Sequence, residues 1–160
     1  MCSLNERQAS IASLRYYPSQ LEAAVAPLSP AQLDTPCGPG EWTARQVVHH
    51  IADAHLNGYV RMKLVLTETK PILKPYDQDA WAALADMDAP VSTSLAMLRG
   101  LHERWSRLLT DLAEAQWDRC GVHLDNGLMT LTALLESYVA HGAEHLAQLQ
   151  RLRRTLGLDR

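Results

Sequence analysis

The sequence predicts an all-α protein, a four-helix bundle with a long crossover between its second and third helices. Four long segments carry apolar residues at spacings of three and four, the period of a helix that buries one face. The strict alternation of polar and apolar residues that marks a strand is absent. One connection, between the second and third segments, is long, which favours a crossover over a series of simple hairpins. At 160 residues, the chain is expected to form one domain over residues 1–160.

The N-terminal region is expected to contain two short helices. Residues 5–15 form the first, which should end before Pro18. Proline fits the first turn of a helix, so Pro18 is expected to open a second segment over 19–26. A further helical turn is expected over 29–33, and the prolines and glycines of 36–40 predict a loop.

The second long helix has a recognisable start. Thr43 and Gln46 form a capping box, in which each side chain satisfies a backbone N–H at the helix start. This helix should run to about Leu66, and residues 70–75, with two prolines, should end it. A short helix over 76–87 is expected within the connection that follows.

The second half of the chain predicts two more long helices. Pro90 is expected to open the third, in which apolar residues recur three and four apart. Residues 120–127 are expected to form a loop, and the last helix should follow from about Thr130.

Composition and charge exclude several classes of protein. The net charge is −3, so there is no basic surface of the kind that binds nucleic acid. No apolar run approaches the length of a membrane span, and no signal pattern is present. Three cysteines, odd in number and without a CxxC motif, indicate a reducing compartment and argue against a zinc site made of thiolates. A cytoplasmic protein that binds neither nucleic acid nor membrane is expected.

The last helix carries a pair of histidines suited to a metal ion. His141 and His145 are four residues apart and therefore lie on one face, one turn from each other. Two imidazoles in this arrangement can bind one ion. The alternative is that both histidines simply pack in a leucine-rich helix.

A third histidine on the second helix could complete the site. His50 shares its face with Ala54, Asn57 and Arg61, a stripe of small and polar residues unlike the aliphatic stripe beside it. One interpretation is that this stripe faces solvent. The other is that it faces a polar cavity inside the bundle, where His50 meets the histidine pair.

The other histidines are expected to be structural. His49 is predicted to pair with Asp53, four residues on. His55 is expected to be a packed core histidine, and His102 and His123 to have structural roles. Trp42 and Trp105 are expected to anchor the core, and Glu144, off the face of His141, to be a solvated charge or a dimer contact.

Several stretches resemble a known family. Residues 42–51 resemble the start of the second helix in the DinB superfamily, where a Trp-Ser/Thr pair precedes a ligand histidine eight residues after the tryptophan. Here that histidine is His50. The pattern of His141, His145 and Gln148 resembles the family's other two ligands and the residue that follows them.

The closer resemblance is to the YfiT-like, or bacillithiol transferase-like, branch. Residues 52–63, 74–77 and 101–105 carry it, and the whole resemblance covers about 15–155. The branch usually has more histidines on its last helix, where this chain has Glu144 and Gln148. This departure leaves the ligand positions intact but puts in doubt that the substrate or thiol is the branch's usual one.

The resemblance implies a metal site formed by His50, His141 and His145. Three neutral imidazoles leave at least one position of a divalent ion open, and both zinc and nickel suit imidazole. The resemblance implies an enzyme that transfers a low-molecular-weight thiol to an electrophilic small molecule, and it implies a homodimer. Many members of the branch are labelled metal-dependent hydrolases, so hydrolysis by a metal-bound hydroxide is the first alternative. A non-catalytic metal-binding or stress-response bundle is the second.

Three residues are candidates for binding the substrate. Asn57 and Arg61, seven and eleven residues after His50, could bind an anionic group of the substrate or thiol, and Arg61 could equally form a surface ion pair. Tyr76, on the connection beside the predicted site, is a candidate proton donor or ligand contact. The sequence identifies no catalytic acid or base.

Overall fold

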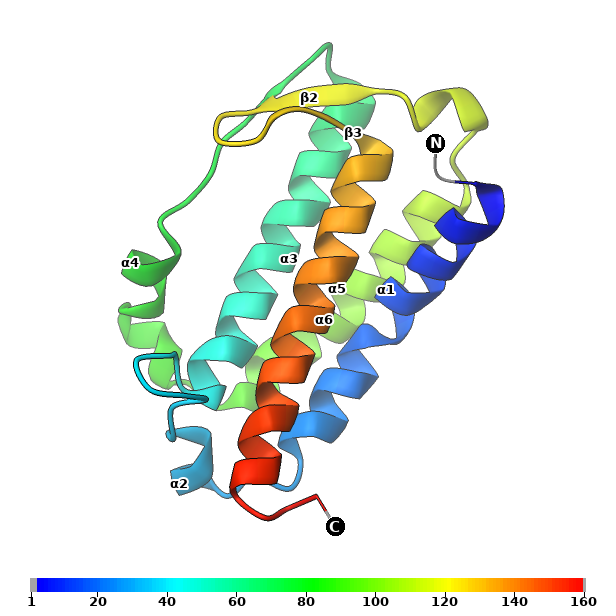
Figure 1. Ribbon diagram of the computed structural model, residues 1–160. Helices are drawn as coiled ribbons and strands as arrows, with labels where there is room; N and C mark the ends of the chain where they lie inside the picture. The colour runs from blue at the N-terminus through cyan, green and yellow to red at the C-terminus, as the bar shows by residue number, and fades with distance from the viewer. Residues whose placement is uncertain (1–2, 160) are drawn as a thin grey trace.

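The computed structural model describes residues 3–159 and forms a four-helix bundle, as predicted. The long helices are α1 (Leu4–Val25), α3 (Ala44–Thr67), α5 (Val91–Thr110) and α6 (Leu131–Thr155). Helices α1 and α3 each pack against both α5 and α6. The connection after α3 returns along the outside of the bundle, so α3 and α5 run in the same direction (Figure 1).

The predicted starts of the long helices are confirmed. The Thr43 hydroxyl accepts a hydrogen bond from the Gln46 N–H at 3.2 Å, and the Gln46 side chain accepts one from the Thr43 N–H at 3.0 Å. Pro90 immediately precedes α5. Thr130 caps α6 by accepting a hydrogen bond from the Ala133 N–H at 3.1 Å. Side-chain capping hydrogen bonds therefore set where α3 and α6 begin, whereas α5 follows a proline without such a bond.

The expected break at Pro18 is wrong, because α1 continues through it from Leu4 to Val25. Leu14, Pro18 and Leu21 are buried against the bundle, and this packing holds the helix together across the proline. Proline has no N–H, so the carbonyl of Leu14, four residues earlier, has no partner within the helix. That carbonyl instead bonds His102 of α5, whose Nδ1 lies 2.5 Å away.

The crossover between α3 and α5 contains short elements rather than the single helix predicted over 76–87. These are β1 (Ile72–Leu73), α4 (Gln78–Ala82) and the 3-10 helix η1 (Ala85–Asp88). The turn predicted over 29–33 is present as α2 (Pro30–Leu33). Residues 36–40 contain no helix, as expected.

The loop predicted over 120–127 is wrong, because these residues begin a hairpin. Strands β2 (Cys120–His123) and β3 (Gly127–Thr130) pair antiparallel, and β1 pairs parallel with β2. Residues 124–126 form the turn, and Gly127, which follows it, has a φ of 72°, where glycine is favoured. A further 3-10 helix, η2 (Glu114–Gln116), precedes the hairpin, and the small sheet lies across the end of the bundle where α6 begins (Figure 1).

Two clusters of buried apolar side chains fill the bundle. One includes Ile51, Leu98 and Leu149, and the other includes Trp105 and Leu135. A layer of histidines lies between them along the helices: His50, His55 and His102, which are buried, and His141, which is half-buried. Among the described residues, no helix has the length and apolar composition needed to cross a membrane.

Candidate metal centre

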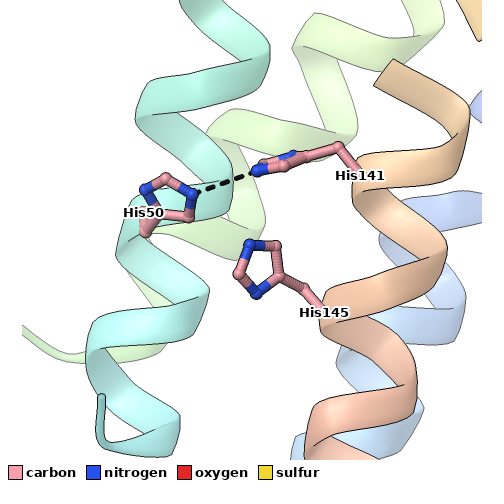
Figure 2. A group of neighbouring side chains, drawn as sticks. All are labelled: His50, His141 and His145. Carbon is pink, nitrogen blue, oxygen red and sulfur yellow. Dashed lines mark hydrogen bonds between the residues drawn. The ribbon is translucent and has the colours of Figure 1, made fainter. Parts of the chain in front are cut away.

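Three histidines from two helices meet inside the bundle. His50 lies on α3, and His141 and His145 lie one turn apart on α6, with all three rings directed toward a common point (Figure 2). One ring nitrogen from each lies within 4.8 Å of the others. His50 Nε2 and His141 Nε2 are 3.1 Å apart. The predicted trio is therefore brought together, with its ligand atoms close enough to share one ion.

The environment keeps these imidazoles neutral at physiological pH. Burial, and then the nearby His141 and His145, lower the pKa of His50 to about 3. Burial also lowers the pKa of His141, to about 4, and that of His145. Only a neutral imidazole has the lone pair that binds a metal.

The ring of His145 is oriented by a side chain from its own helix. His145 Nδ1 donates to Gln148 Oε1 at 2.9 Å, and Gln148 Nε2 donates to Glu41 Oε2 at 2.7 Å. Because the Glu41 carboxylate only accepts, it fixes which end of the Gln148 amide faces the histidine. His145 therefore carries its proton on Nδ1 and presents the lone pair of Nε2 to the site.

A cavity of about 230 Å³ adjoins His141. Arg61 and Tyr76, two of the predicted substrate-binding residues, line it, whereas Asn57 does not and instead donates to the Asp53 carbonyl of its own helix at 2.9 Å. The complete lining consists of Ala54, Arg61, Pro75, Tyr76, Gln78, His123, Asp125, Asn126, Ser137, Tyr138 and His141.

Three side chains that line this cavity, those of Arg61, Tyr76 and His123, carry hydrogen-bond donors. The Arg61 guanidinium donates to the Tyr138 hydroxyl at 2.8 Å and to the Lys74 carbonyl at 2.5 Å, and no carboxylate of the described residues forms an ion pair with it. The Tyr76 hydroxyl is buried without a hydrogen-bond partner, and burial raises the pKa of Tyr76, so it keeps its proton. His123 Nδ1 accepts from the Asp125 N–H at 3.3 Å, which leaves the proton of the neutral ring on Nε2.

The comparison with known proteins agrees with this geometry. Residues 14–149 match the DinB superfamily. The chain belongs to that superfamily.

Individual DinB relatives are similar over most of their length. A protein of Bacillus cereus (strain AH820), whose name gives metal-dependent hydrolase as a provisional activity, is 45% identical over 139 residues, covering 87% of this chain and 80% of the relative. A Bacillus mycoides (strain KBAB4) protein with the same provisional activity in its name is 44% identical over the same length and shares. The structure of YfiT from Bacillus subtilis, described provisionally as a metal-dependent hydrolase with an unusual four-helix bundle topology, superposes with a TM-score of 0.95 at 43% identity, covering 98% of this chain and 91% of that one. The resemblance to YfiT is thereby confirmed.

The donor set of this DinB domain fits a divalent metal ion. Three neutral nitrogen ligands within 4.8 Å of one another, one already oriented by an outer hydrogen bond, match the ligand type and spacing of a three-histidine site. No fourth His, Cys, Asp or Glu of the described residues belongs to this group. The arrangement thus leaves room for a small molecule on the ion.

Other histidines of the DinB domain lie partly as expected. His55 is fully buried, as predicted, and His102 is buried beside it. The predicted pairing of His49 with Asp53 is wrong: His49 Nδ1 lies 2.7 Å from Ser94 Oγ, and its Nε2 lies 3.0 Å from the Ala89 carbonyl. Ala89 of the crossover and Ser94 of α5, which only folding brings close to His49, are therefore its hydrogen-bond partners in place of Asp53.

The two tryptophans that were expected to anchor the core differ in burial. Trp105 is fully buried, as expected for a core anchor, whereas Trp42 is only half-buried and lies against the site, with its ring centre 4.6 Å from that of His50. Glu144 is exposed, in keeping with the expected solvated charge. Of the two departures from the branch pattern, Gln148 alone contacts a predicted ligand.

Sequence reasoning missed two residues near the site. His123, assigned a structural role, lines the cavity because the hairpin carries it there. The signal was available, since Asn-Gly is a strong hairpin motif. Glu41, which bonds Gln148 across 107 residues of sequence, had no local signal at all.

Gln148→Ala is expected to weaken zinc or nickel binding about 10- to 100-fold, because removing the outer partner of a metal-ligating histidine has effects of that size. Competition with a chromophoric chelator measures this affinity. Gln150→Ala, at an exposed position of the same helix, is the matched control and should bind like the unmodified protein. Equal affinities for all three proteins would contradict the role given to Gln148.

Proposed function

We propose that this protein is a metal-dependent enzyme that transfers a low-molecular-weight thiol to an electrophilic small molecule. The observation that carries the proposal is the cavity lined by hydrogen-bond donors and by His141, one of the three neutral imidazoles of the candidate metal centre. The three histidines would hold zinc or nickel, which supplies Lewis-acid activation by stabilising the anionic form of a small thiol or of water.

The cavity residues support an external thiol as the nucleophile. Among the described residues that line the cavity there is no cysteine and no lysine. The one serine of the lining, Ser137, makes no side-chain hydrogen bond to a histidine that could act as its base. The only carboxylate in the lining is that of Asp125, which is exposed on the hairpin. A thiol is acidic enough to need no strong general base once its anion is stabilised, whereas hydrolysis gains more from one. These features favour thiol transfer.

The chain's own residues would orient the reactants. The Arg61 guanidinium and the Tyr76 hydroxyl offer hydrogen-bond donors to a carboxylate or another electron-rich group of the reactants. In the reaction the sulfur–carbon bond forms as the bond between carbon and the leaving group breaks. The thiol proton passes to solvent, and the leaving group departs with its electron pair. Hydrolysis by the same site is the alternative, favoured by the names of the relatives. The homodimer and the cytoplasmic location stay predictions.

An assay with and without thiol tests the proposal. The zinc- or nickel-loaded protein is incubated with 1-chloro-2,4-dinitrobenzene and with cysteine, glutathione or bacillithiol, and conjugates are measured by mass spectrometry. Conjugate formation above the uncatalysed rate, requiring both thiol and metal, supports the transferase. Cleavage of 4-nitrophenyl acetate that needs metal but no thiol would favour the hydrolase. Neither activity in a metal-loaded protein would leave a non-catalytic bundle.

Arg61→Gln is expected to raise the KM of an anionic reactant about tenfold or more, with unchanged metal content, because a charged hydrogen bond contributes about 1.5–3 kcal/mol. Steady-state kinetics and metal analysis check both statements. Arg99→Gln is the control, since Arg99 forms only a surface ion pair with Glu22 at 3.0 Å. An unchanged KM in the Arg61 variant would remove this residue from the binding site.

A further inference from the structure

Two buried histidines lie next to the three candidate ligands and form a series of hydrogen bonds. His55 and His102 are fully buried, and neither belongs to the group whose nitrogens lie within 4.8 Å of one another. His102 Nδ1 lies 2.5 Å from the Leu14 carbonyl, and His102 Nε2 lies 2.8 Å from His55 Nδ1. The series therefore begins at a backbone acceptor in α1 and leads toward the centre of the bundle.

The direction of each hydrogen bond follows from its fixed end. A carbonyl oxygen only accepts, so His102 must donate from Nδ1. Burial holds the pKa of His102 at about 4, so the ring is neutral and its Nε2 accepts. His55 must then donate from Nδ1, and its own Nε2 is left with a lone pair and no proton.

The series ends at two complementary groups without partners. His55 Nε2 and His141 Nδ1 are both buried and neither makes a hydrogen bond. His141 Nε2 is the atom that faces His50, so a neutral His141 that binds metal through Nε2 carries its proton on Nδ1. Of these two unpaired groups, His55 Nε2 is thus an acceptor and His141 Nδ1–H is a donor. Each costs about 1–3 kcal/mol while it stays unpaired.

We propose that His55 is a positioning residue whose Nε2 accepts a hydrogen bond from the Nδ1–H of His141 and so holds His141 in its metal-binding form. The two ring centres are 5.8 Å apart and inclined by 47°. The hydrogen-bonded rings of His55 and His102 are 4.9 Å apart and the His50 and His141 rings 5.2 Å, so a small movement of the His141 ring would bring its Nδ1 to a comparable separation from His55. The Leu14 carbonyl, His102 and His55 then form one series of hydrogen bonds that fixes the tautomer of the ligand. The proposal rests on metal binding by the three histidines and is independent of whether the reaction is thiol transfer or hydrolysis.

The arrangement at the neighbouring ligand supports this role. His145 already donates its Nδ1 proton to Gln148. A metal-bound histidine nearly always donates a hydrogen bond from the N–H of its second ring nitrogen to such a partner. His55 Nε2, on the ring whose centre lies 5.8 Å from that of His141, is a buried acceptor without a donor. The Tyr17 and Tyr76 hydroxyls are also buried without a partner, but a hydroxyl can donate as well as accept, whereas His55 Nε2 can only accept.

Two substitutions of one residue test the proposal. His55→Phe keeps a ring but removes the acceptor, whereas His55→Gln can place an amide oxygen near the position of Nε2. Zinc affinity is measured by chelator competition on the folded proteins. His55→Phe is expected to raise the Kd about 10- to 100-fold, and His55→Gln to restore it to within a few-fold of the unmodified protein. Unchanged affinity in His55→Phe, or equal loss in both variants, would overturn the proposal.

A spectroscopic measurement on the unmodified protein keeps the proposal testable if the variants do not fold. Long-range ¹H–¹⁵N spectra of the zinc-loaded protein report which nitrogen of each histidine carries a proton. Protons on Nδ1 of His102, His55 and His141 are expected. The chemical shift of the His141 Nδ1 proton should also show that it forms a hydrogen bond. A proton on Nε2 of His55 would overturn the proposal.

Discussion

A protein with His141 replaced by alanine is expected to lose its metal ion on purification, with an affinity reduced by more than about 100-fold. The reason is that a directly bound ligand contributes more than the outer partners, whose loss costs about 10- to 100-fold. His141 is central to the group, with its Nε2 only 3.1 Å from His50 Nε2. Elemental analysis of untagged protein measures the metal per chain.

Thermal unfolding offers a second measurement of the same variant. A metal present at 100 times its Kd stabilises the folded state by about 2.7 kcal/mol, so zinc should raise the Tm of the unmodified protein and not that of His141→Ala. His49→Ala is the matched control, because His49 is buried on the same helix as His50 but bonds Ser94 and the Ala89 carbonyl. Metal loss in the His49 variant, or retention in the His141 variant, would show that the ligand set is wrong.

Gly58→Ala is expected to destabilise the protein by about 1–3 kcal/mol, the usual effect of overpacking a well-filled core. Gly58 lies in α3 between two aromatic rings, and a Cβ atom there would stand 2.6 Å from Tyr138 Cζ and 2.7 Å from Trp105 Cη2. Trp105 is fully buried, and Tyr138 is bonded to Arg61, so neither ring can move away easily. Urea denaturation followed by circular dichroism measures the free energy of unfolding.

Gly100 provides the matched control for this prediction. It lies in α5, is exposed, and a Cβ atom there would meet nothing within 4 Å. Gly100→Ala is therefore expected to stabilise the helix by about 0.5–1 kcal/mol, because alanine has less backbone freedom to lose on folding. If both variants unfolded at the same urea concentration, the tight contact around Gly58 would not be real.

The helices could be predicted from the sequence because their signals are local. The capping box at Thr43 and Gln46 and the recurring leucines of α6 need no information from elsewhere in the chain. Pro18 misled the prediction because a proline usually ends a helix, and here long-range packing on both sides of it prevails. The hairpin was missed because strand alternation was required, and the turn motif at Asn126-Gly127 was not weighed.

In the candidate site, too, the features set by local sequence could be predicted and those set by long-range contacts could not. The pair of histidines on α6 follows from helical spacing, and the resemblance selected His50 among its neighbours. The hydrogen-bond partners could not be predicted, because Glu41 reaches Gln148 and Ser94 reaches His49 only after folding. Which nitrogen of a ring carries the proton depends on such contacts, and helical spacing contains no information about it.

The proline inside α1 links the backbone of one helix to the chemistry of another. A helix normally uses every interior carbonyl for itself, so a free one is an unusual acceptor, rigid and without rotamers of its own. Any residue with an N–H at position 18 would compete with His102 for the Leu14 oxygen. Positions 18 and 102 are therefore expected to covary among relatives of this chain, although one residue is apolar and the other is a histidine on a different helix.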